Sequence, residues 1–210
     1  MISRDAAKGF LVSFAGAVAG RRDLLTELDR AIGDADHGTN LDRGLTAVVE
    51  KLETAVEPDV GALFTLAGRV LISTVGGASG PLYGSLFLKM GLATAGQREV
   101  NLKEFAAAFR KGVEAVMKLG KAKVGDKTMV DALVPALEAL EVAAEGGLAT
   151  GAALEEAARA AEGGAVRTIP LVARKGRASY LGERSAGHQD PGATSSQLLL
   201  RAAAEALRDP

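Results

Sequence analysis

The chain has 210 residues, a length that suits one domain with a sizeable core. Its 25 basic and 26 acidic side chains give a formal net charge of −1, so there is no electrostatic reason to expect binding to nucleic acid or to an anionic membrane. The absence of cysteine excludes disulfides, thiolate catalysis and zinc–thiolate sites, and it fits a cytoplasmic protein.

Hydrophobic periodicity predicts an all-α chain, because apolar residues recur at helical spacing and no strand pattern is visible. A hydrophobic content of 48% with only 4% aromatic residues favours closely packed helices with a core of Ala, Leu and Val. Ser3 is the expected N-cap of the first helix. The predicted helices cover about residues 4–19, 23–32, 41–52, 60–71, 82–94, 102–117, 128–144, 152–173 and 193–207.

Two of the later helices contain residues that are expected to interrupt them. Pro135 should kink the seventh helix or shift its start. The pair Gly163-Gly164 should break the eighth helix, which then resumes and ends at Ala173. No repeat or interdomain linker divides the sequence, so residues 1–210 are expected to form a single domain.

Three aspartates stand close together after the second helix, in the stretch LDRAIGDADHGTNLDR. That helix is expected to end at Gly33 in a left-handed cap, which puts Asp29 near the negative end of the helix dipole. Asp34 and Asp36 add two more anions within a few residues. A hard divalent cation such as Mg²⁺ would relieve this repulsion, so the three aspartates are candidate metal ligands.

Each aspartate also has a structural interpretation. Asp34 suits a turn, Asp36 suits the N-cap of the next helix, and Asp29 alone suits a solvated helix surface. An EF-hand is excluded, because Leu45 occupies the twelfth loop position, where a bidentate Glu is required.

Glycine-rich and charged loops follow. The stretch GGASGPLYG, residues 76–84, places bare backbone before a helix, an arrangement that binds phosphate through free N–H groups, although glycines also allow close helix packing. The loop at 120–128 carries Lys121, Lys123 and Lys127, which face either phosphate or solvent. Residues 175–192 lack periodicity, and such long loops are usually functional or disordered; this one contains Arg177, Tyr180, Arg184, His188 and Asp190.

Four stretches, IGDADHGTNLDRG, GGASGPLYG, GDKTMVDAL and ASYLGERSAGHQDPGATSS, resemble in their order those of the nucleotide-binding L subunits of dihydroxyacetone kinase, the DhaL family. The resemblance covers essentially the whole chain. It implies an antiparallel barrel of eight amphipathic helices, with the nucleotide at one end. It also implies that Asp29, Asp34 and Asp36 hold two Mg²⁺ ions against the phosphates of ADP or ATP.

Further site residues follow from the same resemblance. Arg177 and His37 are the candidate catalytic residues, although His37 also suits a turn residue that only holds the aspartate loop. The implied nucleotide contacts are His37, Gly38, Thr39, Asn40, Ala78, Ser79, Gly120, Met129, Arg177, Asp190, Pro191 and Gly192.

The activity that the resemblance implies is phosphoryl transfer. In the type that depends on the phosphotransferase system, an M subunit donates phosphate through bound ADP/ATP to dihydroxyacetone held on a K subunit. A homodimer is the expected assembly, with no nucleic acid or membrane partner. Two alternatives stay open: an ATP-dependent kinase subunit for another short keto sugar such as erythrulose, and a nucleotide-loaded partner of a transcription regulator.

Overall fold

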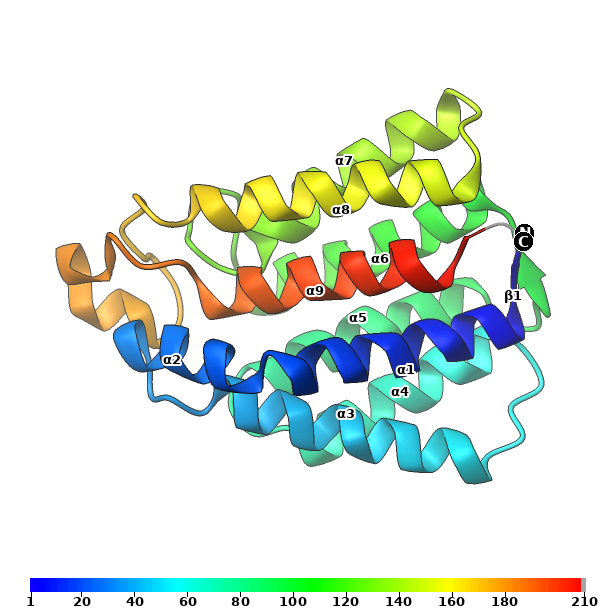
Figure 1. Cartoon of the computed structure of the whole chain (residues 1–210), viewed down its shortest axis with the longest axis horizontal. Helices are drawn as coiled ribbons and strands as arrows, with labels where there is room; N and C mark the ends of the chain where they lie inside the picture. The colour runs from blue at the N-terminus through cyan, green and yellow to red at the C-terminus, as the bar shows by residue number, and fades with distance from the viewer. Residues whose placement is uncertain (209–210) are drawn as a thin grey trace.

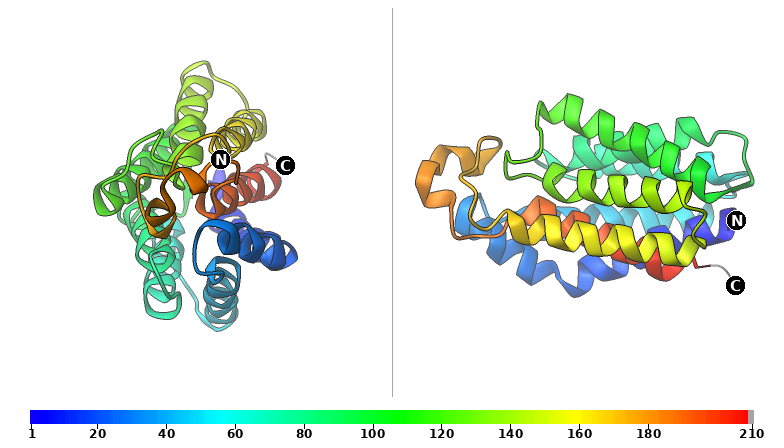
Figure 2. Two further views of the ribbon diagram at one scale, coloured as in Figure 1. Left: turned by 90° about the vertical axis from the view of Figure 1, so that its left-hand side faces the viewer. Right: turned by 90° about the horizontal axis from the view of Figure 1, so that it is seen from above.

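Long α-helices run roughly along one common axis in the computed structural model, which describes residues 1–208 (Figure 1). The N-terminus and the end of α9 (Pro191–Ala206) lie at one end of the bundle, and α2 (Arg22–Ile32) lies with the 3-10 helix η1 (Arg177–Ser185) at the other end (Figure 2). Over the described residues the helices are α1 (Arg4–Gly20), α2 (Arg22–Ile32), α3 (His37–Thr54), α4 (Val60–Thr74), α5 (Ser79–Ala93), α6 (Leu102–Gly120), α7 (Val130–Glu145), α8 (Thr150–Arg167), η1 (Arg177–Ser185) and α9 (Pro191–Ala206).

Packing between consecutive helices encloses one main apolar core. From α3 to α9, each α-helix contacts the next, while α1 contacts both α3 and α9. Alanine, leucine and valine dominate the core. The ring of Phe64 meets that of Phe10 edge-on at 6.3 Å between centroids and lies tilted at 6.0 Å from that of Phe87. The all-α prediction is confirmed. No helix within residues 1–208 is long and apolar enough to cross a bilayer.

A short pair of strands was not expected from the sequence. β1 (Ile2–Ser3) pairs antiparallel with β2 (Glu99–Val100), so that Ile2 lies opposite Val100. Two residues are too few to produce a recognisable alternation of apolar and polar side chains. The pair fastens the N-terminus to the α5–α6 connection, at the end of the bundle opposite η1.

Helix starts follow from side-chain capping and from proline chemistry. Ser3 caps α1 as expected, because its Oγ accepts the N–H of Ala6 at 3.2 Å. The fifth helix begins at Ser79, three residues earlier than predicted, with Pro81 in its first turn. Proline is tolerated there because the first-turn N–H groups have no partner within the helix. Pro135 lies inside α7, which begins at Val130.

The predicted break in the eighth helix is wrong. α8 continues through Gly163 and Gly164 and ends at Arg167, and residues 168–173 form turns and irregular backbone instead of more helix. A Cβ atom on Gly164 would lie 2.2 Å from the backbone oxygen of Asp131 in α7. Gly164 therefore permits a close approach of α7 and α8, and it marks a helix crossing rather than a helix end.

The same two glycines give a matched test of this packing. We expect Gly164→Ala to lower the free energy of unfolding by about 1–3 kcal/mol, because its new methyl group would meet α7 backbone. Gly163→Ala should raise that free energy by up to about 1 kcal/mol, because alanine favours the helix and the new methyl would meet only the flexible end of Arg167. Urea unfolding followed by circular dichroism measures both; equal effects would contradict the interpretation.

Candidate functional site

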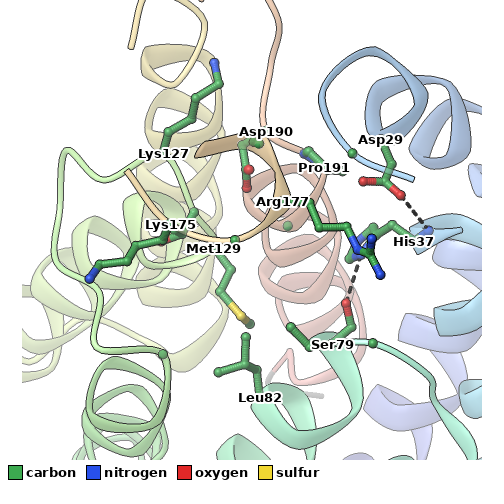
Figure 3. A pocket seen from close by; sticks show the side chains of 18 of the residues that line it. Asp29, His37, Ser79, Leu82, Lys127, Met129, Lys175, Arg177, Asp190 and Pro191 are labelled. Atoms are coloured by element: carbon green, nitrogen blue, oxygen red, sulfur yellow. Dashed lines mark hydrogen bonds between the residues drawn. The ribbon is translucent and has the colours of Figure 1, made fainter. Parts of the chain in front are cut away.

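A cleft of about 260 Å³ opens at the end of the bundle where α2 and η1 lie. Its wall is formed by segments distant in sequence: the end of α2 and the loop after it, the turn before α5, the α6–α7 loop, the start of η1 and the start of α9. Figure 3 shows Asp29 on one side of the cleft and the apolar side chains of Leu82 and Met129 on the other.

The three candidate metal ligands come together at this cleft. One carboxylate oxygen from each of Asp29, Asp34 and Asp36 lies within 4.8 Å of the other two. Between Asp34 and Asp36, the backbone of Ala35 adopts a left-handed conformation with φ 62°. A non-glycine residue in this conformation costs roughly 1–3 kcal/mol, so the surrounding loop must sustain a shape that its own residues do not favour.

Asp29 is buried, although it stands in the last turn of α2. Its Oδ2 accepts the backbone N–H groups of Asp36 at 2.9 Å and His37 at 3.1 Å. These groups form the N-terminus of α3, whose positive dipole end stabilises the carboxylate. The interpretation of Asp29 as a solvated helix residue is therefore wrong, and the next helix offsets its unfavourable place at the end of α2.

The expected left-handed cap at Gly33 is also wrong, because the φ of this residue is −146°. Glycine is needed here for a different reason. A Cβ atom on Gly33 would lie 2.1 Å from Oδ1 of Asp29. The missing side chain leaves room for the buried carboxylate.

Asp36 stands at the N-cap of α3, but its side chain makes no capping hydrogen bond. Burial, and then the negative charge of Asp34, raise the pKa of the Asp36 carboxyl. Three crowded carboxylates supply only hard oxygen donors, which is the donor set that Mg²⁺ and Ca²⁺ take. The residues present therefore fit a divalent cation.

Arg177, the first residue of η1, reaches across the cleft to the aspartate loop. Its Nε lies 2.9 Å from Oδ2 of Asp34. The Arg177 side chain is 69% exposed, so this ion pair adds little to stability. The ion pair instead fixes the position of the Arg177 guanidinium beside the carboxylates. A guanidinium is a good phosphate ligand.

His37 connects the aspartate loop to the glycine turn before α5. Its Nδ1 lies 3.0 Å from Oγ of Ser79, the first residue of α5, and its Nε2 lies 2.9 Å from Oγ of Ser195 in α9 (Figure 3 shows the first contact). Burial lowers the pKa of the His37 imidazole to about 4. The ring is therefore neutral near pH 7.

Lys127 has a different role from those expected for the lysines of its loop. Its side chain is 1% exposed, and its ammonium donates to the backbone oxygens of Thr168 at 2.6 Å and His188. It thereby joins the two ends of the segment that carries η1, next to the hydrogen bond from Gly187 N–H to the Ile169 oxygen at 2.8 Å. Lys121 and Lys123 are exposed.

Asp190, the N-cap of α9, joins the start of that helix to the residue directly after α8. Its carboxylate accepts the N–H of Ala193 at 2.7 Å, and its own N–H donates to Oγ1 of Thr168 at 2.9 Å. Burial raises the pKa of Asp190 to about 7. Pro191 and Gly192, which follow it, line the cleft.

Most residues expected at the site line the cleft, and three do not. Gly38 packs against α2, where an added Cβ would lie 2.1 Å from a backbone oxygen. Thr39 donates from its Oγ1 to the backbone oxygen of Asp36 at 3.0 Å, and Oδ1 of Asn40 accepts from Arg43 at 2.8 Å. The expected residues that line the cleft are Asp29, Asp34, Asp36, His37, Ala78, Ser79, Gly120, Met129, Arg177, Asp190, Pro191 and Gly192.

Sequence reasoning did not find the apolar side of the cleft. Leu82, Val116 and Val130 line it beside Met129. Leu82 and Val116 belong to the apolar stripes of α5 and α6, where a cleft-lining residue has the same pattern as a core residue. Only the three-dimensional arrangement separates the two.

Comparison with known families identifies the domain that contains this cleft. Residues 31–205 match the DAK2 domain, a range that contains every lining residue except Asp29. The chain belongs to the DAK2 domain family.

Several relatives of this DAK2 domain are named as kinase subunits. The ADP-binding subunit DhaL of a PEP-dependent dihydroxyacetone kinase from Escherichia coli (strain K12) is 49% identical over 187 residues, covering 89% of each chain. The ADP-binding subunit DhaL of a PTS-dependent dihydroxyacetone kinase from Lactococcus lactis is 39% identical over 99% of this chain and 100% of the relative. An L-erythrulose 1-kinase from Mycolicibacterium smegmatis is 36% identical over 98% of this chain but only 36% of the relative.

Solved structures contain the same DAK2 fold. The native dihydroxyacetone kinase of C. freundii matches with a TM-score of 0.74 and 27% identity, over 95% of this chain and 34% of that chain. The kinase from C. freundii in complex with AMP-PNP and Mg²⁺ has the same TM-score and identity, over 33% of its length. This chain therefore spans about a third of that kinase.

The neutral His37 predicts how stability depends on pH. Its folded-state pKa of about 4 lies below the ordinary 6.5, so the unfolded chain takes up the proton first as the pH falls. The resulting stability is fully present above pH 6.5 and should decline by about 3 kcal/mol as the pH falls through 4. Urea unfolding between pH 7.5 and about 4 should show this decline, reduced in His37→Gln; an unchanged decline in the variant would contradict the assignment.

Proposed function

We propose that this chain is the ADP-binding subunit of a phosphoenolpyruvate-dependent dihydroxyacetone kinase, and thus a phosphotransferase subunit. One observation carries the proposal: the carboxylate cluster and the N-terminus of α5 face a common cleft in a DAK2 domain. The named ADP-binding relatives match this chain over 87–100% of their own length, which supports the same role here.

The cleft suggests how a nucleotide would lie. Phosphates would sit at Ala78 and Ser79, where the first N–H groups of α5 and the helix dipole favour an anion. Two Mg²⁺ ions would lie between these phosphates and the three aspartates. The adenine would enter the apolar side near Met129 and Gly120, and Arg177 would cover the phosphates together with the turn at 190–192. In this arrangement residues 1–210 act as one domain, an antiparallel barrel of eight helices that carries its nucleotide at one end.

The packing order of the helices supports the barrel. Because α9 contacts α1 as well as α8, the last helix of the chain lies beside the first. Such closure gives one end at which α2, η1 and the start of α5 meet. Residues Gly38, Thr39 and Asn40 would then contribute through the first turn of α3, whose N–H groups hold Asp29.

Phosphoryl transfer requires charge neutralisation and alignment more than covalent chemistry from the protein. Bound Mg²⁺ would supply charge neutralisation at the phosphate oxygens. Within the chain, the α5 N-terminus orients the phosphates, and Arg177 stabilises negative charge that develops during transfer. Both ring nitrogens of His37 already contact serine hydroxyls, so we assign it to positioning Ser79 rather than to accepting a proton.

The proposed assembly places the other chemistry on partner subunits. A K subunit would hold dihydroxyacetone, and an M subunit would return phosphate to the bound ADP. Both subunits would approach the open end of the cleft. The complex would work in the cytoplasm, and this chain would form a homodimer. The η1 segment lies at that end, and Tyr180 on it is 87% exposed.

A second candidate is an ATP-dependent kinase domain for another short keto sugar. Relatives named L-erythrulose kinases support it, since they contain a region that is 35–36% identical to this chain. The two functions differ in how long the nucleotide stays bound, because a rephosphorylated coenzyme is retained whereas a substrate must exchange.

The aspartate cluster predicts metal-dependent binding of nucleotide. Asp34→Ala should weaken ADP binding in the presence of Mg²⁺ by at least about tenfold, with little effect when Mg²⁺ is absent, because the variant loses one oxygen ligand. Titration calorimetry measures both affinities, and circular dichroism checks the helices. Asp23→Ala is the matched control, since this aspartate of α2 has a side chain that is 89% exposed. Retention of full Mg²⁺-dependent affinity in Asp34→Ala would refute the metal assignment.

Nucleotide exchange separates the two candidate functions. Protein loaded with labelled ADP is mixed with excess unlabelled ATP, and the release of label is followed over time. We expect release that is much slower than turnover with K and M subunits, because the nucleotide would serve as a retained coenzyme. Release as fast as turnover would favour the ATP-dependent kinase instead.

A further inference from the structure

A chain of buried hydrogen bonds runs from the cleft into the core. Ser79 lines the cleft and contacts Nδ1 of His37, whose Nε2 contacts Oγ of Ser195. The hydroxyl of Tyr83 lies 2.7 Å from Oγ of Ser195 and 3.1 Å from Oγ of Ser196. Tyr83, Ser195 and Ser196 are all fully buried, so these groups satisfy one another without solvent.

Ser195 is the branch point of this chain. Its Oγ lies 2.9 Å from Nε2 of His37, 2.7 Å from the Tyr83 hydroxyl and 3.0 Å from the backbone oxygen of Gly192. A serine hydroxyl has one proton to donate and two lone pairs. Because the Gly192 oxygen only accepts, the Ser195 proton goes either to that oxygen or toward the other two partners.

The acceptor of the Ser195 proton decides whether the Ser79 hydroxyl can donate a hydrogen bond into the cleft. If Ser195 donates to Gly192, the neutral imidazole of His37 carries its proton on Nε2, and its Nδ1 accepts the proton of Ser79. Ser79 then presents only lone pairs to the cleft. If Ser195 instead donates to Nε2, the imidazole proton lies on Nδ1 and is donated to the Ser79 oxygen. The Ser79 proton is then free to point into the cleft.

We propose that Ser195 is a positioning residue for nucleotide phosphate: in the nucleotide-bound protein its hydroxyl donates to Nε2 of His37, which leaves the Ser79 hydroxyl free to donate to a phosphate oxygen. The inference rests on the proposed function, since it requires a nucleotide phosphate at the start of α5. An anion needs donors, and lone pairs of Ser79 directed at it would repel it. Phosphate binding therefore selects the second arrangement, and Ser195 makes that arrangement possible without touching the nucleotide.

The proton on His37 can be located directly by nuclear magnetic resonance. The sequence has two histidines, so His188→Gln leaves one imidazole to observe. Long-range ¹H–¹⁵N spectra of the ¹⁵N-labelled His188→Gln chain are recorded with saturating ADP and Mg²⁺. We expect Nδ1 in the range of a protonated ring nitrogen and Nε2 in the range of an unprotonated one.

Two neighbouring serines provide the matched variants. Ser195→Ala should weaken ADP binding about tenfold, the effect of one lost hydrogen bond, and should abolish the Nδ1-protonated pattern. Ser196→Ala removes an equally buried hydroxyl from the same helix that contacts Tyr83 but not His37. It should leave both the affinity and the pattern unchanged, which a general packing role for these serines would not predict.

Each outcome bears on the proposal. A proton on Nε2 in the ADP complex, or equal affinities of Ser195→Ala and Ser196→Ala, would overturn it while leaving the nucleotide site intact. If the unsubstituted chain binds no ADP with Mg²⁺, the proposed function is wrong and this inference falls with it. Should Ser195→Ala fail to fold, the position of the imidazole proton in the His188→Gln chain still decides.

Discussion

The contact on which the rest of the site depends is the carboxylate of Asp29 seated on the N-terminus of α3. It joins the end of one helix to the start of the next, and it satisfies two backbone N–H groups that would otherwise lack partners. Because Asp29 takes over this capping role, the Asp36 side chain makes no capping hydrogen bond and lines the cleft instead. The loop between the helices is thereby bent into a shape that includes the left-handed Ala35. The negative charge of Asp29, which would be unfavourable at the end of α2 alone, thus becomes part of a preorganised cluster of three carboxylates.

Side chains that cross the cleft connect segments distant in sequence to this carboxylate cluster. Arg177 brings η1 to Asp34, and His37 brings the start of α5 to α9 through two serines. Lys127 holds both ends of the η1 segment at backbone oxygens, which is an unusual use of a buried ammonium group. Burying a charge is expensive unless hydrogen bonds compensate it, so these carbonyls account for the burial of the Lys127 ammonium beside the cleft.

Sequence reasoning predicted the helical class, the position of most helices and the convergence of three aspartates, because each has a local signal: periodicity of 3.6 residues, a capping serine at Ser3, and like charges close along the chain. The predictions at glycines were wrong because glycine occurs both where a helix ends and where two groups must approach closely. Gly163-Gly164 has the composition of a helix end, but α8 continues through it and Gly164 allows α7 and α8 to approach. Gly33 makes room for a carboxylate rather than for a left-handed turn. The roles of Lys127 and Ser195 depend on partners more than 40 residues away, and no local pattern carries that information.

The strand pair near the N-terminus and the last turn of α9 lie at the pole of the bundle away from the cleft. α1 has 17 residues and is about 26 Å long, so a peptide attached ahead of Ile2 begins roughly that far along the bundle from the cleft. A second domain fused at this end would therefore not obstruct the opening of the cleft. A connecting peptide as long as the bundle would be needed for such a domain to reach the cleft. This geometry suits a module found both in separate subunits and as about a third of longer kinases.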